Sequence, residues 1–74
     1  MDFKAAAWEV LEEVGHPLHY TYITEIALQS DYLQSAGRTP QNTMRARLSV
    51  DVRDNPDTPF VQVAPGVYGL RQAS

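Results

Sequence analysis

The segment from Gly37 to Leu48 constrains the fold more than any other, because it carries a strong signal for the start of a helix. Thr39 is a favourable N-cap residue, since its hydroxyl can accept a hydrogen bond from a backbone N–H of the first turn. Pro40 then falls at the first helical position, where its missing N–H costs nothing. Polar and basic side chains follow at Gln41, Asn42 and Arg45. The sequence therefore predicts a helix over residues 39–54 with a polar, cationic front end.

Two shorter helices are expected before this one. The first runs from Asp2, its candidate cap, to Val14, and Gly15 sits where a left-handed residue can end a helix. Its apolar residues recur at the spacing of one helical face: Phe3, Ala7, Val10, Leu11 and Val14, with Trp8 widening the face. The second helix runs from Thr21, as its cap, to Tyr32. The residues expected to face the core are Ile23, Ile26 and Ala27, with Leu33 directly after the helix as a further candidate.

The last third of the chain has the pattern of a β-hairpin. Two prolines within residues 55–59 forbid regular structure there and end the helical region. Two strand-like runs follow, over residues 60–64 and 67–70, with a Pro-Gly turn between them. Because a two-stranded hairpin is marginal alone, a third short strand near Leu18–Tyr20 would complete a small sheet. The predicted fold is α+β, a winged helix-turn-helix in which three helices are followed by a two-stranded β-hairpin wing.

Chain length and composition favour one small domain. With 74 residues and no cysteine, the chain depends on a single apolar core, and a hydrophobic fraction of 43% is compatible with that. The sequence has no apolar run long enough to span a bilayer and no recognisable secretion signal. We therefore expect an intracellular protein, in the bacterial cytoplasm or nucleoid, with residues 1–74 forming the N-terminal module of a longer chain.

The charges are distributed unevenly, although the formal net charge is only −3. A net negative charge counts against nucleic-acid binding, because phosphate contacts dominate such affinity. Six of the nine acidic residues, however, precede Gly37, and five of the six basic residues follow it. This division indicates a surface with an acidic side and a basic side.

Short motifs occur in a fixed order through most of the chain: Ala6-Ala7, Val10-Leu11, Pro17-Leu18-His19-Tyr20, Ile23, Ile26, Gly37-Arg38-Thr39-Pro40, Arg47-Leu48, Asp51-Val52, Phe60, Val63, Pro65-Gly66 and Tyr68-Gly69-Leu70. In this order the chain resembles the HARE helix-turn-helix domain, a winged-helix module of chromatin proteins, bacterial restriction endonucleases and the polymerase delta subunit. The resemblance implies DNA binding, in some members linked to modified bases or chromatin, and no catalysis within the domain. It also implies a second class of partner, because the similar domain of the delta subunit serves RNA polymerase.

The third helix and the hairpin carry the candidate DNA-binding residues. Asn and Gln side chains can pair with adenine, and Arg with guanine, in the major groove. The free N–H groups at a helix start can bind a phosphate. The resulting set is Arg38, Thr39, Gln41, Asn42, Arg45, Ser49, Arg53 and Gln62. The alternative is an ordinary solvated face with scattered charge. Arg47 lies off the outward face by about a third of a turn and can equally pair with Asp51, four residues on.

Other polar residues are weaker candidates. His16 and His19 have no evident further metal ligand nearby, so a hydrogen-bonded structural His19 is favoured. The carboxylate pairs Glu12-Glu13 and Asp54/Asp57 have no base partner and no apolar pocket to shift their pKa. We expect no catalysis, no cofactor, no metal and no small-molecule substrate.

The sequence therefore predicts a non-catalytic module that binds double-stranded DNA. It would serve as the targeting arm of a larger protein such as a modification-sensing restriction endonuclease. The alternative is a protein-interaction module of the delta-subunit type, with RNA polymerase or another protein as partner, which the acidic first half supports. Neither interpretation involves a membrane.

Overall fold

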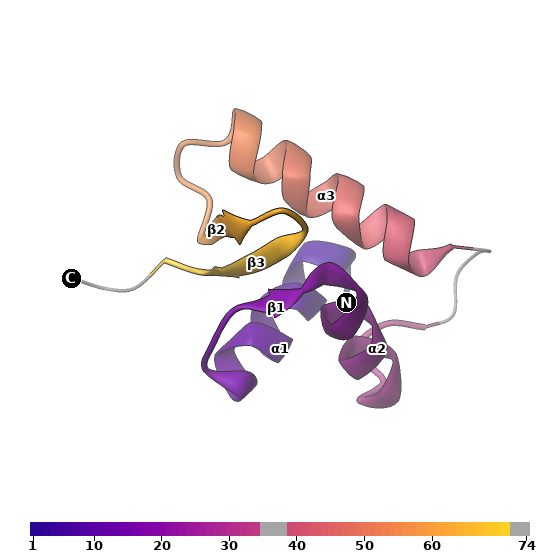
Figure 1. The fold of residues 1–74 in the computed structure, drawn as a ribbon. Coiled ribbons are helices and arrows are strands. Elements are labelled where there is room, and N and C mark those ends of the chain that lie inside the picture. The colour runs from indigo at the N-terminus through magenta and orange to yellow at the C-terminus, as the bar shows by residue number, and fades with distance from the viewer. Residues whose placement is uncertain (35–38, 72–74) are drawn as a thin grey trace.

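The computed structural model describes residues 1–34 and 39–71. In these two ranges the elements are α1 (Phe3–Val14), β1 (Leu18–His19), α2 (Tyr20–Gln29), α3 (Pro40–Asp54), β2 (Phe60–Ala64) and β3 (Val67–Leu70). Helix α3 runs along one side of the molecule, next to the hairpin, while α1 and α2 pack beneath it (Figure 1). The predicted α+β winged-helix architecture is confirmed, including the short third strand.

The ends of α1 are where the sequence predicts them. The Asp2 carboxylate accepts a hydrogen bond from the Ala5 N–H at 2.7 Å, which caps the first turn. Gly15 adopts the left-handed conformation with φ of 81°, and its N–H donates to the Leu11 carbonyl. Ala6, Ala7, Val10 and Leu11 form the buried face between these ends. Trp8 does not widen this face as expected, because it lies about 60° beyond Leu11, the outermost residue of the buried face, and is 39% exposed.

Helix α2 begins earlier and ends earlier than the predicted span from Thr21 to Tyr32. Its N-cap is His19, whose Nδ1 accepts from the Thr21 N–H at 3.3 Å. The helix ends at Gln29, and Asp31 follows with a φ of 60°. Tyr32 therefore lies outside the helix, where its hydroxyl donates to both Glu13 carboxylate oxygens at 2.8 Å and ties this segment to α1.

The sheet has the order β1-β3-β2, and both of its strand pairs are antiparallel. Strand β3 lies in the centre, with Leu18 opposite Tyr68 on one side and Phe60 opposite Leu70 on the other. Strand β1 is shorter than predicted because Tyr20 already belongs to α2. The Tyr20 N–H nevertheless donates to the Gly66 carbonyl at 2.9 Å, so the start of α2 is joined to the turn of the hairpin.

One apolar core joins all three helices to the sheet. Its buried members are Ala6, Ala7, Val10, Leu11, Ile23, Ala27, Leu33, Met44, Leu48, Phe60 and Tyr68. Helix α3 contributes two of these residues, so most of its circumference stays outside the core. No helix within residues 1–34 or 39–71 is long and apolar enough to cross a membrane.

Candidate nucleic-acid interface

Helix α3 has one buried side and a wide exposed side. Met44, Leu48 and Asp51 are buried against the rest of the domain. The exposed positions of the helix are Gln41, Asn42, Arg45, Ala46, Arg47, Val50, Arg53 and Asp54. Because α3 lies along the outside of the molecule (Figure 1), this exposed side is open to a large partner.

The start of α3 agrees with the prediction in position but not in detail. Thr39 is the N-cap residue, Pro40 follows it, and the Thr39 carbonyl accepts from the Thr43 N–H at 3.2 Å. The Thr39 hydroxyl, however, makes no capping hydrogen bond, with backbone angles φ −140° and ψ 70°. The expected hydroxyl cap is therefore wrong, and the exposed Thr39 side chain is not used by the helix. Arg38 lies outside the described residues.

Gln41 and Asn42 lie in the first turn of α3, where both are exposed. Arg45 follows one turn later, and its Cζ atom lies 5.9 Å from the centroid of the Tyr20 ring. The structure thus brings three of the predicted contact residues together at the front of one helix. The aromatic partner of Arg45 was not predicted, because only the fold brings the start of α2 next to α3.

Ser49 faces the sheet rather than open solvent. It is half-buried, and its hydroxyl lies 2.6 Å from the hydroxyl of Tyr68, which is 1% exposed. This hydrogen bond links α3 to the central strand. Helical spacing places Ser49 beside Arg45 and Arg53, but it does not reveal the tyrosine that lies opposite it.

Arg53 is exposed at the end of α3 and forms a two-point ion pair with its neighbour Asp54. Its Nε lies 2.9 Å from one carboxylate oxygen and its Nη2 lies 3.0 Å from the other. These hydrogen bonds raise the pKa of Arg53 and lower the pKa of Asp54. The two side chains are 71% and 58% exposed, so the pair contributes little to stability and partly offsets the charge of Arg53.

Asp51 forms a hydrogen-bond network that the sequence did not predict. Its carboxylate accepts from the Thr58 hydroxyl, from the Asn55 amide at 3.3 Å and from Lys4 at 3.3 Å. The Thr58 hydrogen bond is the main cause that lowers the pKa of Asp51, with smaller effects from Asn55 and Lys4, while burial opposes them. The ion-pair partner of Asp51 is thus Lys4 of α1 rather than Arg47. The network also fixes the segment before β2 against α3.

The hairpin places Gln62 on β2, exposed and opposite Tyr68 of β3. Arg71 follows β3, and its guanidinium donates to the Pro56 carbonyl at 3.2 Å. Gln62 therefore belongs to the wing, on a different element from the cluster at the front of α3.

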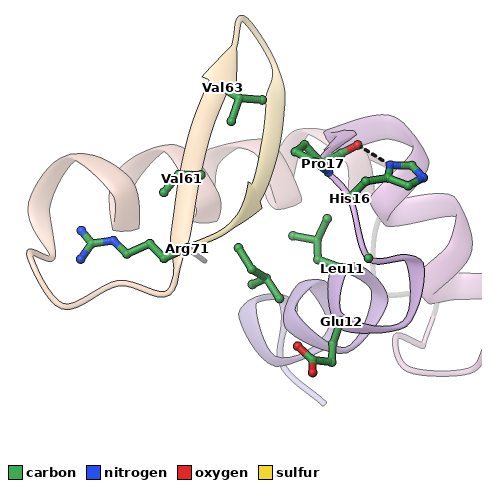
Figure 2. Close-up of a pocket in the computed structure, with 9 residues that line it drawn as sticks. Leu11, Glu12, His16, Pro17, Val61, Val63 and Arg71 are labelled. Carbon is green, nitrogen blue, oxygen red and sulfur yellow. Dashed lines mark hydrogen bonds between the residues drawn. The ribbon is translucent and has the colours of Figure 1, made fainter. Parts of the chain in front are cut away.

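A hollow of about 540 Å³ lies between the end of α1 and the hairpin (Figure 2). Leu11, Pro17, Val61 and Val63 supply apolar walls. In Figure 2 the guanidinium of Arg71 extends to the left, while the carboxylate of Glu12 lies at the lower end of the hollow. His16 also lines the hollow, so its wall is mainly apolar with three polar side chains, Glu12, His16 and Arg71, at its margins.

The two histidines have structural hydrogen bonds. His16 Nδ1 lies 2.9 Å from the Pro17 carbonyl, and His19 Nδ1 lies 2.8 Å from the Thr21 hydroxyl. The prediction of a hydrogen-bonded structural His19 is confirmed. In the described part of the chain, no group of three or more His, Cys, Asp or Glu residues is placed to hold a metal ion.

Comparisons with known proteins agree with this geometry. The HARE-HTH family model, whose description includes ASXL and a restriction endonuclease HTH domain, matches residues 1–73, which is nearly the whole chain. No curated protein and no solved structure gives a significant match. The family match comes from the sequence pattern, and the three helices with their hairpin agree with a helix-turn-helix domain.

Proposed function

Because the chain belongs to the HARE-HTH family of DNA-binding helix-turn-helix domains, we propose that it is a non-catalytic module that binds double-stranded DNA. Helix α3 enters the major groove, and the β2–β3 hairpin lies beside it as the wing. The observation that carries this proposal is the exposed cluster of Gln41, Asn42 and Arg45 at the front of α3.

The chemistry of this cluster suits a DNA groove. The major groove is wide enough for one α-helix, and amide side chains can form two hydrogen bonds with adenine there. Gln41 and Asn42 are therefore the candidate base contacts. Arg38, Thr39, Arg45 and Arg53 are the candidate phosphate or guanine contacts, with Ser49 and Gln62 at the margins of the same proposal.

The number of cations limits the affinity of this module. The set contains only three arginines, and one of them shares its charge with Asp54. With about three to five phosphate contacts in all, the logarithm of the binding constant falls with the logarithm of salt concentration at a slope of roughly −3 to −4.5. Such a module suits a targeting arm of a larger protein, as in a modification-sensing restriction endonuclease.

A titration with duplex DNA at low and moderate salt tests the proposal. The variant with Arg38→Gln and Arg45→Gln should lose nearly all binding at moderate salt. The matched control, Gln29→Glu with Gln34→Glu, changes the net charge by the same amount at the far end of α2 and just beyond it, and should bind almost as well as the wild type. Equal binding by wild type, variant and control would rule out this interface.

A second candidate is a protein-interaction module of the delta-subunit type, with RNA polymerase as the partner. The observation that favours it is the acidic outer side of α1, where Glu12 and Glu13 are exposed, together with the ion pairs of Lys4 and Arg53. A pull-down that retains polymerase, without any DNA binding at low salt, would favour this second function over the first.

A further inference from the structure

Tyr20, the first residue of α2, lies where three parts of the domain meet. Its ring lies under the guanidinium of Arg45, with 5.9 Å from Cζ to the ring centroid. Its N–H donates to the Gly66 carbonyl in the turn of the wing. We propose that Tyr20 is a positioning residue that directs Arg45 to a DNA phosphate and leaves the reading of bases to amide side chains, Asn42 among them. This inference rests on the proposed DNA-binding function.

The contact between Arg45 and Tyr20 has the geometry of a cation–π interaction. A guanidinium within about 6 Å of an aromatic centroid is attracted by the electron-rich face of the ring. The planar guanidinium keeps its N–H groups at its edge, so it can stack on a ring and still donate to an anion. Arg45 therefore does not need to leave Tyr20 in order to bind a phosphate.

The ring of Tyr20 is itself fixed by its neighbours, so it can hold Arg45 in one position. Its ring packs against the ring of His19, with 4.5 Å between the centroids and 30° between the planes. The Nδ1 of His19 in turn accepts the N–H of Thr21 and lies 2.8 Å from its hydroxyl. Because the histidine is fixed by this cap, the tyrosine ring has little freedom to turn away from Arg45.

The turn of the wing packs closely against the same rings. A Cβ atom at Gly66 would come within 2.7 Å of His19 Nε2 and 3.3 Å of Tyr20 Cε1. Gly66 also has a φ of 74°, a conformation that L side chains rarely adopt. Glycine at this turn therefore lets the wing pack against the rings of His19 and Tyr20. Because Arg45 lies over Tyr20, its position is set relative to the wing as well as to α3.

Arg45 and Asn42 leave α3 in different directions. They are separated by three residues, which places them about 60° apart around the helix axis. Asn42 belongs to an exposed line opposite the core, together with Ala46, Val50 and Arg53. Arg45 instead lies on the flank that faces the start of α2, where Tyr20 holds it.

This difference in direction separates two kinds of DNA contact. The outer line of a helix in the major groove faces the base edges, whereas its flanks face the phosphates of the groove walls. Asn42 is thus placed for a base and Arg45 for a phosphate. Tyr20 strengthens this division because it keeps the arginine on the flank.

The test measures the affinity of the protein for several duplex sequences over a series of salt concentrations. Arg45→Gln should weaken binding to every duplex by a similar factor and reduce the salt slope by about one unit. Tyr20→Leu should weaken binding about two- to fivefold for every duplex, and Tyr20→Phe should restore it, since phenylalanine keeps the aromatic face. Tyr20→Leu should have no further effect once Arg45 is Gln. Asn42→Ala should instead change the order of preference among the duplexes.

Three results would overturn the inference. The first is a Tyr20→Leu protein that is folded and keeps both the wild-type affinity and the wild-type salt slope. The second is an Arg45→Gln protein with a changed order of preference among the duplexes, which would make Arg45 a base contact. The third is a wild-type protein without salt-dependent binding, which removes the proposed function together with this inference.

The wild-type protein supplies a readout that does not depend on the folding of Tyr20→Leu. Nuclear magnetic resonance of the Arg45 side chain should show its guanidinium protons shifted upfield, because Cζ lies over the ring of Tyr20. Ordinary chemical shifts at those protons would overturn the positioning role, even where Arg45→Gln behaves as a phosphate contact.

Discussion

Helices α1 and α3 pack against each other and share the same core, but they present different chemistry to solvent. Helix α1 is fixed at both ends, by Asp2 and Gly15, and exposes the carboxylates of Glu12 and Glu13. Helix α3 begins without a side-chain cap and exposes amides and guanidiniums. The net charge of −3 is thus the sum of two unlike surfaces, and its sign describes neither of them.

The largest expected effect concerns the apolar core that α1 and α3 share. Leu48 of α3 is fully buried, so Leu48→Ala should lower the free energy of unfolding by about 2–5 kcal/mol, because a cavity remains where the side chain packed. Val50 is 46% exposed on the same helix, and Val50→Ala should change stability by less than about 0.5 kcal/mol. Urea denaturation measures both. Similar losses for the two variants would contradict the burial pattern of α3.

The next effect concerns the network of Asp51, which joins α1 to α3 through Lys4. Asp51→Ala should cost about 1–3 kcal/mol, because buried Thr58 loses the acceptor of its hydroxyl. Thr58→Val should cost a similar amount, and the double variant should cost less than the sum of the two single losses. Strictly additive losses in a double-mutant cycle would show that the two side chains do not interact.

The same network predicts how stability depends on pH. The pKa of Asp51 is lowered in the folded protein, chiefly by the Thr58 hydrogen bond. Its contribution is therefore present in full above the unfolded pKa of about 4 and is lost as the pH falls through the folded pKa. Unfolding followed between neutral pH and about pH 2 should show this loss, and Asp51→Asn should reduce it. Asp54→Asn is the control, since its carboxylate is exposed and should contribute less.

A smaller effect compares the starts of the two helices. Asp2→Ala should cost about 1 kcal/mol, because the carboxylate accepts the Ala5 N–H. Thr39→Ala should cost only a few tenths of that amount, because the Thr39 hydroxyl caps nothing. Thermal unfolding of both variants checks the difference. A larger loss for Thr39→Ala would mean that its hydroxyl does bind the first turn of α3.

The smallest expected effect is on DNA affinity, when one negative charge is removed from either helix. Asp54→Asn removes the partner of Arg53 at the end of α3, and should strengthen DNA binding roughly twofold at low salt, because an exposed ion pair is worth less than about 1 kcal/mol. Glu12→Gln removes one negative charge from α1 and should have less effect. The DNA affinities of both variants, measured in the same buffer, test this difference. Equal gains in affinity would mean that binding depends only on the total charge.

Local signals in the sequence were sufficient for much of the fold. The ends of α1, the strands of the hairpin and the start of α3 follow from Asp2, Gly15, Pro40 and the Pro-Gly turn, because each acts on its immediate neighbours. The cap of α2 was misplaced at Thr21, since threonine is the commoner cap and histidine is rarely one. Only the structure shows the ring nitrogen of His19 in that role.

The candidate site was less predictable, because its details depend on contacts between distant residues. Spacing along α3 brings Gln41, Asn42 and Arg45 to one end of the helix without knowledge of the rest. It does not reveal the ring of Tyr20 beneath Arg45, or the hydroxyl of Tyr68 beside Ser49. These partners lie 19 or more residues away along the chain, where no periodic pattern points to them.

The irregular register between Gln62 and Ala64 lies on β2, an edge strand of the sheet. A regular edge strand presents a row of unpaired backbone N–H and C=O groups, with which another chain can pair. A bulge interrupts that row, and Pro65 directly after it has no N–H to offer. The opposite border is formed by β1, which has only two residues. Copies of this domain crowded together are thus poorly suited to joining sheet to sheet, and this protects them against aggregation.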